Sequence, residues 1–488
     1  MNLRATSAMV VFVLLAVVAL MSSAGAAFVP PSTPIGECLE RYFTAFNAGE
    51  EAMKAFIVQY VADESLKQRP VEDRLTRYRG MHTELGSLRP VQLVDADSAS
   101  ATVLAEATKG TWLEFAFQFE TAPPHKLLSI RIEQAEPPSA AEPQSPMTER
   151  EFLDSLRARL DNMSKNDEFS GAVLIAKNGS PIFLKAYGLA STEFGVPNRT
   201  NTKFNLGSIN KIFTRVAIGQ LIEQGKVRFE DTLGKFLPDY PRPDARRQVE
   251  ISHLISMTSG IGDFFGETFD NTPKDRFRSN SDFLPMFDSL PLQFAPGAQR
   301  QYSNGGYVLL GAIIEKVSGE SYYDYVREHI FGPAGMSNTD SYEADVPVAN
   351  LAEGYTSSST DKSTSRRKNI YTRPARGSAA GGGYSTVEDL LKFAIALENN
   401  RLLTPAYTEW LLTDTPPDPQ KTGSARQQNT GGPRGIGVAG GAPGINASLE
   451  ADFSSGYTVV VLGNYDPPNT ERVATQARKW LRRVTKSK

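Results

Sequence analysis

The stretch NLGSINKIFT, residues 205–214, places a serine and a lysine three positions apart at the predicted start of a helix. Apolar residues continue at helical spacing to Ile222, and Gly225 marks the predicted end, so Ser208 falls in the first turn. Side chains three apart share a helix face, with about 5 to 6 Å between Cβ atoms, so Lys211 can reach the Ser208 oxygen. The spacing fits a serine nucleophile with a lysine base, or two ordinary residues on a solvated helix.

The surroundings of the pair separate these two interpretations. The same spacing occurs twice more, at Ser359 with Lys362 and at Ser365 with Lys368. Those two matches lie in the polar stretch SSSTDKSTSRRK, which predicts a loop, whereas apolar residues flank Ser208 and Lys211. A lysine is a base only when it is neutral, and burial lowers its pKa by up to about 3 to 5 units. We therefore predict that Ser208 and Lys211 are the reactive pair.

A Ser-His-Asp triad is the commoner way to activate a serine, and the sequence argues against it. From residue 148 onward the only histidines are His253 and His329, and neither is in a context suited to a triad base. The G-x-S-x-G elbow is also absent from the sequence. In QYSNGG, Tyr302 and Asn304 would project the same way from an extended loop before a helix beginning near Gly305. The alternative is a structural role, with Asn304 as the helix N-cap and Tyr302 packed beside it.

Length and composition indicate a multidomain protein that acts on small substrates. The 488 residues predict two or three structural units. A net charge of -3, with 40% apolar and 22% charged residues, favours neither nucleic acid nor an anionic membrane surface as a partner, so a small-molecule or peptide substrate is expected. Cys38 is the only cysteine, which excludes an intramolecular disulfide and a zinc site built on several cysteines.

The N-terminal third divides into three predicted segments. Residues 1–26 carry Arg4, an apolar run and small residues, typical of a secretory signal peptide, so we expect a secreted or periplasmic protein beginning near Ala27, with an uncleaved anchor as the alternative. Residues 28–134 show helical periodicity followed by alternating strands, a small α+β domain whose order resembles the NTF2-like family. Residues 135–147 form a proline-rich linker.

Residues 148–488 predict an α/β sandwich with an antiparallel sheet and a helical region. Two strands joined at Asn178-Gly179 come early in this segment, because Asn-Gly between apolar runs is a strong hairpin signal. INASLEADF and YTVVVLGN predict two more strands near its end, followed by a helix. The sheet would therefore combine strands from both ends of the segment, with a mainly helical middle.

Several stretches together resemble the serine β-lactamase-related family, which includes class C β-lactamases, D-Ala-D-Ala carboxypeptidases, D-aminopeptidases and β-lactamase-like esterases. The matching stretches are FNLGSINKIFT, VEISHLISMTSGIGDF, FAPGAQRQYSNGGYVLLGAIIEKVSG, HIFGPAGMSNTDSY, GSAAGGGYSTVEDLLKFAIAL and GGAPGINASLEADFSSGYTVVVLGNYD. The resemblance covers residues 148–484. It implies Ser208 as acyl-enzyme nucleophile, Lys211 as its base, Tyr302 as partner base or proton donor, and Asn304 as a ligand to substrate and to Lys211. It implies no metal and no cofactor.

The third motif departs from the family pattern. A sheet-edge K-T-G or H-x-G motif is usual, and its position here is taken by Val438-Ala439-Gly440, with the Gly441 N–H as the implied second oxyanion donor. A literal Lys421-Thr422-Gly423 lies in a stretch without a strand pattern and is the alternative. We expect an exported serine hydrolase. Because valine cannot bind a substrate carboxylate, we favour esterase activity. D-amino-acid peptidase or β-lactamase activity, and a binding protein on a decayed hydrolase scaffold, are the alternatives.

Overall fold

The computed structural model describes residues 28–96, 99–108, 110–135, 146–357, 366–417 and 434–485. Contacts divide the chain into two compact units, Met1–Gln144 and Ser145–Lys488. The predicted signal peptide and most of the predicted linker lie outside the described residues, as does Lys421-Thr422-Gly423. The alternative serines Ser359 and Ser365 also lie outside them.

The first unit is an α+β domain, as predicted. Its helices come first: α1 (Pro34–Ala48), α2 (Glu50–Tyr60), α3 (Asp63–Gln68) and α4 (Val71–Leu85). The antiparallel sheet follows in the order β1 (Leu88–Ala96), β2 (Ser100–Ala107), β3 (Trp112–Phe119) and β4 (Leu127–Ala135). Alternate residues of β3 are buried, and the Phe117 ring packs edge-on against Tyr42 of α1 with centroids 5.2 Å apart. The short α3 was not predicted.

The second unit is built on a five-stranded antiparallel sheet that joins both ends of the segment. Its order is β13 (Gly435–Ala442), β14 (Ile445–Asp452), β15 (Tyr457–Gly463), β5 (Gly171–Lys177) and β6 (Ser180–Tyr187). Asn178 (φ 49°) and Gly179 (φ 75°) form the tight turn between β5 and β6, as the sequence predicts. Val460 pairs with Leu174 in the centre, where β15 meets β5. The predicted sheet is confirmed.

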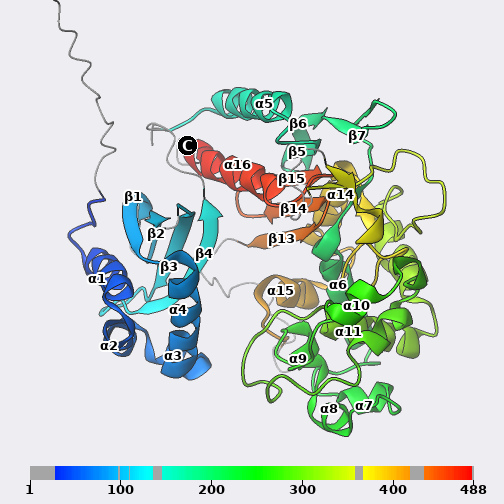
Figure 1. Cartoon of the computed structure of the whole chain (residues 1–488), viewed down its shortest axis with the longest axis horizontal. Helices are drawn as coiled ribbons and strands as arrows, with labels where there is room; N and C mark the ends of the chain where they lie inside the picture. Colours follow the sequence, from blue (N-terminus) through cyan, green and yellow to red (C-terminus); the bar gives the residue numbers. More distant parts are fainter. Residues whose placement is uncertain are drawn as a thin grey trace, which may run out of the picture. The chain divides into compact units, whose positions relative to one another are not determined.

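Helices cover both faces of this sheet, which makes the unit a sandwich (Figure 1). On one face, α5 (Glu149–Lys165) and α16 (Asn469–Thr485) enclose a core that includes Leu156, Val459 and Trp480. A larger core on the other face joins the sheet to α6 (Asn210–Glu223), α11 (Asn304–Ser318) and α14 (Val387–Glu398). The predicted antiparallel sheet with a helical region is therefore confirmed.

Shorter elements complete the second unit. The helices are α7 (Leu233–Phe236), α8 (Pro243–Gln248), α9 (Ile251–Ile255), α10 (Glu267–Asn271), α12 (Tyr322–Val326), α13 (Gly332–Ala334) and α15 (Pro405–Thr413). The strands are β7 (Leu189–Ser191), β8 (Val196–Pro197), β9 (Phe204–Asn205), β10 (Tyr355–Thr356), β11 (Arg367–Lys368) and β12 (Tyr384–Ser385). They pair as β7–β8, β9–β12 and β10–β11. The β9–β12 pair lies next to Ser208, because β9 ends at Asn205, just before that serine.

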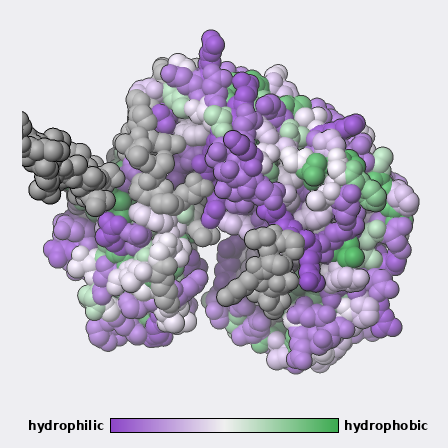
Figure 2. Space-filling model, turned by 45° about the horizontal axis from the view of Figure 1, so that its top comes forward, coloured by the Kyte–Doolittle hydropathy of each residue, from purple (hydrophilic) through white to green (hydrophobic). Residues whose placement is uncertain are grey.

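The surface is largely polar on the face drawn in Figure 2, where hydrophobic residues are scattered among hydrophilic ones. Among the helices of the described residues, none has both the length and the apolar character needed to cross a membrane.

Candidate active site

Ser208 lies at the start of a helix, after a tight turn. Asn205 ends β9, and its Oδ1 accepts a hydrogen bond from the Gly207 N–H at 2.9 Å. Gly207 has a φ of 50°, which favours glycine, and a Cβ there would lie in tight contact, 3.0 Å from the Gly441 nitrogen. A 3-10 turn, Gly207–Ile209, then leads into α6. The half-buried Ser208 is thereby held in the first helical turn.

The Lys211 amine is buried and faces Ser208. Only 6% of the residue is exposed, and Nζ lies 3.3 Å from Ser208 Oγ. Nζ also donates to the Asn304 Oδ1 at 2.6 Å and to the Ala380 carbonyl. Burial lowers the pKa of Lys211 to about 7, although the negative charge of Asp263 opposes this effect. A large fraction of Lys211 is therefore neutral near pH 7. With two N–H groups donated to Asn304 and Ala380, the lone pair of the neutral amine points toward Ser208.

Tyr302 also contacts Ser208. Its hydroxyl donates to Ser208 Oγ at 2.6 Å, and its ring centroid lies 4.8 Å from the Lys211 Nζ. Burial is the main effect that raises the Tyr302 pKa, so the phenol stays protonated near neutrality. Tyr302 can therefore supply a proton at the serine oxygen.

Asn304 is not the cap of its helix. Ser303 is the N-cap of α11, because its hydroxyl accepts a hydrogen bond from the Gly306 N–H at 2.9 Å. The interpretation of Asn304 as N-cap is therefore wrong. Its side chain is buried and reaches Lys211 instead.

Asp263 completes this network, and the sequence pattern did not single it out. Its Oδ2 accepts from the Asn304 Nδ2 at 2.7 Å and from the Asn304 backbone N–H at 3.3 Å. Asp263 precedes Asn304 by 41 residues, in a loop after α9 that carries no periodic signal. The only sequence hint is its place in VEISHLISMTSGIGDF, one of the stretches that resemble the family.

Strand β13 runs beside the Ser208 turn and comes closest to it at Gly440. A Cβ on Gly440 would lie 2.0 Å from the Leu206 carbonyl oxygen and 2.7 Å from the Ser208 nitrogen, so only glycine fits. Val438 is half-buried, lies opposite Leu449 of β14 and packs against the larger core. Side chains two apart in a strand share a face, so Val438 projects to the same side as Ser208. The stretch Val438-Ala439-Gly440 thus lies beside the Ser208 turn.

A glycine-rich loop, residues 377–383, supports the turn from another side. The Leu206 N–H donates to the Gly383 carbonyl at 2.7 Å, and the Gly382 N–H donates to the Gly207 carbonyl at 3.2 Å. Because the Ala380 carbonyl also accepts a hydrogen bond from the Lys211 Nζ, this loop contacts Lys211 and the two residues before Ser208. The glycine run in GSAAGGGY was the available sequence signal, and no role was predicted for it.

The histidines have local partners away from this network. His253 Nδ1 accepts from the Glu250 N–H at 3.2 Å, at the start of α9. His329 Nε2 lies 3.1 Å from a Glu320 oxygen. Among the described residues, Glu320, Glu328 and His329 form the one group that could hold a metal ion, with ligand atoms within 4.8 Å of one another. A surface hydrogen bond between Glu320 and His329 accounts for this group, which shares no residue with the Ser208 network.

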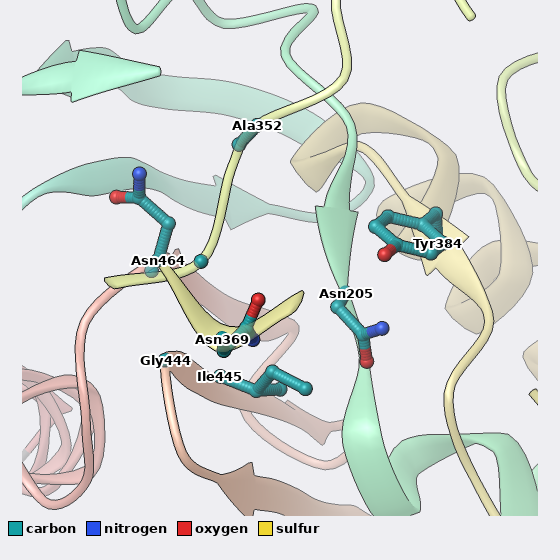
Figure 3. Close-up of a pocket in the computed structure, with 9 residues that line it drawn as sticks. Asn205, Ala352, Asn369, Tyr384, Gly444, Ile445 and Asn464 are labelled. Carbon is teal, nitrogen blue, oxygen red and sulfur yellow. The ribbon is translucent and has the colours of Figure 1, made fainter. Parts of the chain in front are cut away.

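A small polar pocket adjoins the turn before Ser208 (Figure 3). Asn205, Asn369, Asn464 and Tyr384 are among its lining residues, and Ser208, Lys211 and Tyr302 are not. Asn369 Nδ2 donates to the Pro443 carbonyl at 2.8 Å, and Asn464 Nδ2 donates to the Leu189 carbonyl at 2.9 Å. These amides tie loops together, which gives the pocket a structural explanation.

The chain is similar to several known proteins over its second unit. A family model described as Beta-lactamase matches residues 156–482. Penicillin-binding protein 4* of Bacillus subtilis strain 168 is 36% identical over 189 residues, 38% of this chain and 41% of that protein. Teichoic acid D-alanine hydrolase of Staphylococcus aureus is 27% identical over 260 residues, 52% of this chain and 60% of that protein. The chain thus spans about half the length of these two relatives.

A solved structure extends the similarity over a whole relative. The penicillin binding protein from Bacillus halodurans is 33% identical, with a TM-score of 0.58. The match covers 65% of this chain and 98% of that one. The matched region of the family model lies entirely within the unit Ser145–Lys488.

Proposed function

The chain belongs to the beta-lactamase family, and on that premise we propose that it is a serine hydrolase that forms an acyl-enzyme at Ser208 on ester or amide substrates. The observation that carries the proposal is the hydrogen-bonded network of Tyr302, Ser208, Lys211 and Asn304 around a lysine whose pKa burial lowers to about 7. A neutral amine beside a serine hydroxyl is the arrangement that nucleophilic catalysis needs.

In the proposed acylation step, Ser208 Oγ forms a bond to the substrate carbonyl carbon and its proton passes to the Lys211 Nζ. The carbonyl π electrons move to the oxygen, which becomes an oxyanion. As that oxyanion re-forms the carbonyl, the bond to the leaving group breaks, and the leaving group takes a proton from the Tyr302 hydroxyl. Lys211 then returns its proton to the Tyr302 phenolate. In the second half of the reaction water attacks the acyl carbonyl carbon, one water proton passes to Lys211, and Ser208 Oγ leaves and is reprotonated from the network, which regenerates the free enzyme.

The oxyanion requires two preorganised donors. We assign the first to the Ser208 N–H at the N-terminal end of α6, where the helix dipole also favours negative charge. We assign the second to the Gly441 N–H. The close approach of Gly440 to the Ser208 nitrogen supports this assignment, because it keeps β13 beside the nucleophile.

Neutral esters are the substrate class we favour. Val438 projects to the side of Ser208 and offers neither charge nor hydrogen bond, so a substrate carboxylate would lose hydration there without a partner. D-alanyl compounds are the second candidate, because a 27% identical relative is named for D-alanine hydrolysis.

We further propose that the protein is exported through residues 1–26 and that residues 28–134 belong to the NTF2-like class.

Covalent labelling tests the proposal and separates an enzyme from a non-catalytic binding protein. The wild-type protein is incubated with a fluorophosphonate, and the adduct is located by mass spectrometry. We expect an adduct on Ser208, and we expect Ser208→Ala and Lys211→Ala each to abolish it, because nucleophile and base act as a unit. Ser359→Ala is the control and should label normally. An adduct on another serine, or none at all, contradicts the proposal.

A further inference from the structure

Asp263 contacts the proposed reactive network through Asn304, and both of its oxygens are engaged. Oδ2 accepts from the Asn304 side chain at 2.7 Å and from its backbone N–H at 3.3 Å. Oδ1 accepts from the Phe265 N–H at 3.1 Å. The half-buried carboxylate is therefore held in place from two sides by its own loop and by the start of α11.

The orientation of the Asn304 amide depends on this carboxylate. An ionised carboxylate only accepts hydrogen bonds, whereas an asparagine side chain has one accepting oxygen and one donating amino group. With the amino group on Asp263, the amide oxygen is the atom that faces the Lys211 Nζ, at 2.6 Å. A flipped amide would bring two acceptors together at Asp263 and two donor groups together at Lys211.

We propose that Asp263 is a positioning residue for the reaction: it fixes the Asn304 amide so that its oxygen holds the Lys211 Nζ and leaves the remaining Nζ direction to Ser208. The inference rests on the acyl-enzyme function proposed above and deepens it. Asn304 Oδ1 and the Ala380 carbonyl occupy two directions of the nitrogen. A correctly oriented amide therefore determines where the lone pair of a neutral Lys211 points.

The charge of Asp263 has the opposite effect on the base. A negative carboxylate favours protonated lysine and so reduces the neutral fraction of Lys211. The Tyr302 and Tyr307 rings also face Nζ, at 4.8 and 5.5 Å, and both phenols have raised pKa values and stay uncharged near neutrality. A variant of Asp263 that loses the charge but keeps an acceptor should therefore differ in its pH–rate profile from a variant that loses both.

The experiment compares Asp263→Ala and Asp263→Asn with the wild-type full chain in the hydrolysis of a neutral ester, as kcat/KM against pH. We expect Asp263→Ala to lower the plateau about tenfold, the equivalent of one lost hydrogen bond to the base. Asparagine retains an acceptor for the Asn304 amino group, so Asp263→Asn should keep most of the plateau. Its acidic limb should move to lower pH, because Lys211 loses a nearby negative charge.

Glu267→Gln is the matched control, since it removes an exposed carboxylate four residues further along and should leave both plateau and limb unchanged. An Asp263→Ala profile that coincides with the wild type overturns the inference, and so do equal losses in both variants with an unmoved limb. If thermal melting shows that Asp263→Ala is unfolded, the acidic limb of the Asp263→Asn pH–rate profile alone decides the test. Fluorophosphonate labelling of wild-type Ser208 is measured in parallel, and its failure would refute the proposed function itself.

Discussion

At the scale of single residues, two opposing effects set the pKa of Lys211. Burial lowers its pKa to about 7, and Asp263 acts against that change. If neutral Lys211 is the base, kcat/KM for a neutral ester should rise with pH and level off above an inflection near pH 7. The measurement is a pH–rate profile at constant ionic strength, with Ser208→Ala subtracted to remove spontaneous hydrolysis. An inflection near the ordinary lysine value, or a flat profile, would contradict a buried lysine base.

Val438 gives the second prediction at this scale, because it separates substrate classes that share every chemical step. A charge-assisted hydrogen bond contributes about 1.5 to 3 kcal/mol, which corresponds to roughly 10- to 150-fold in efficiency. We therefore expect Val438→Lys and Val438→His to raise turnover of carboxylate-bearing substrates, such as penicillins and D-alanyl peptides, relative to neutral esters. Parallel kcat/KM values for nitrocefin and a short acyl ester provide the ratio.

Val438→Met is the control for this prediction, because it lengthens the side chain without adding charge and should leave the ratio near its wild-type value. Efficient nitrocefin hydrolysis by the wild-type protein that Lys421→Ala abolishes would contradict the assignment. Lys421-Thr422-Gly423 would then be the third motif.

At the scale of secondary-structure elements, the contact of β13 with the Ser208 turn depends on one missing side chain. A Cβ on Gly440 would lie 2.0 Å from a backbone oxygen, whereas one on Gly437 of the same strand would meet nothing within 4 Å. Gly440→Ala should therefore push β13 away from the turn, misplace the proposed Gly441 donor and lower the acylation rate by roughly 100-fold or more. Gly437→Ala should not. Fluorophosphonate labelling rates measure both, and equal rates in the two variants would argue against β13 as the oxyanion strand.

The elements also show how far the sequence alone could predict this protein. Periodicity located the sheet strands near both ends of the second unit, because buried strands and an Asn-Gly turn leave local signals. The Ser208–Lys211 contact could also be predicted, because two residues three apart on one helix are a local signal. Asp263 and the 377–383 loop were not predicted as parts of the site, since their contacts with Asn304 and Gly207 join residues far apart in the chain. Short strands such as β9 and β12 carry two residues each and leave no periodic pattern.

At the scale of the whole molecule, each unit has a hydrophobic core of its own. The buried residues of the first core all lie between residues 35 and 127. Those of the two cores on either side of the second sheet lie between residues 147 and 484. All residues proposed for catalysis come from the second unit. The first unit therefore contributes no side chain that the proposed chemistry requires, and we propose substrate access or partner contact as its role.

Residues 146–488 should accordingly fold and hydrolyse a small ester when expressed alone. The cut must keep Met147, which is buried in the core beneath α5, and Thr148, whose side chain forms the capping box of α5 with Glu151. A cap of this kind contributes about 1 kcal/mol, so the same segment with Thr148→Ala should melt at a lower temperature yet retain kcat/KM. Thermal melting and ester turnover are measured on both. A folded, monodisperse 146–488 segment without turnover, alongside an active full chain, would show that the first unit takes part in the reaction.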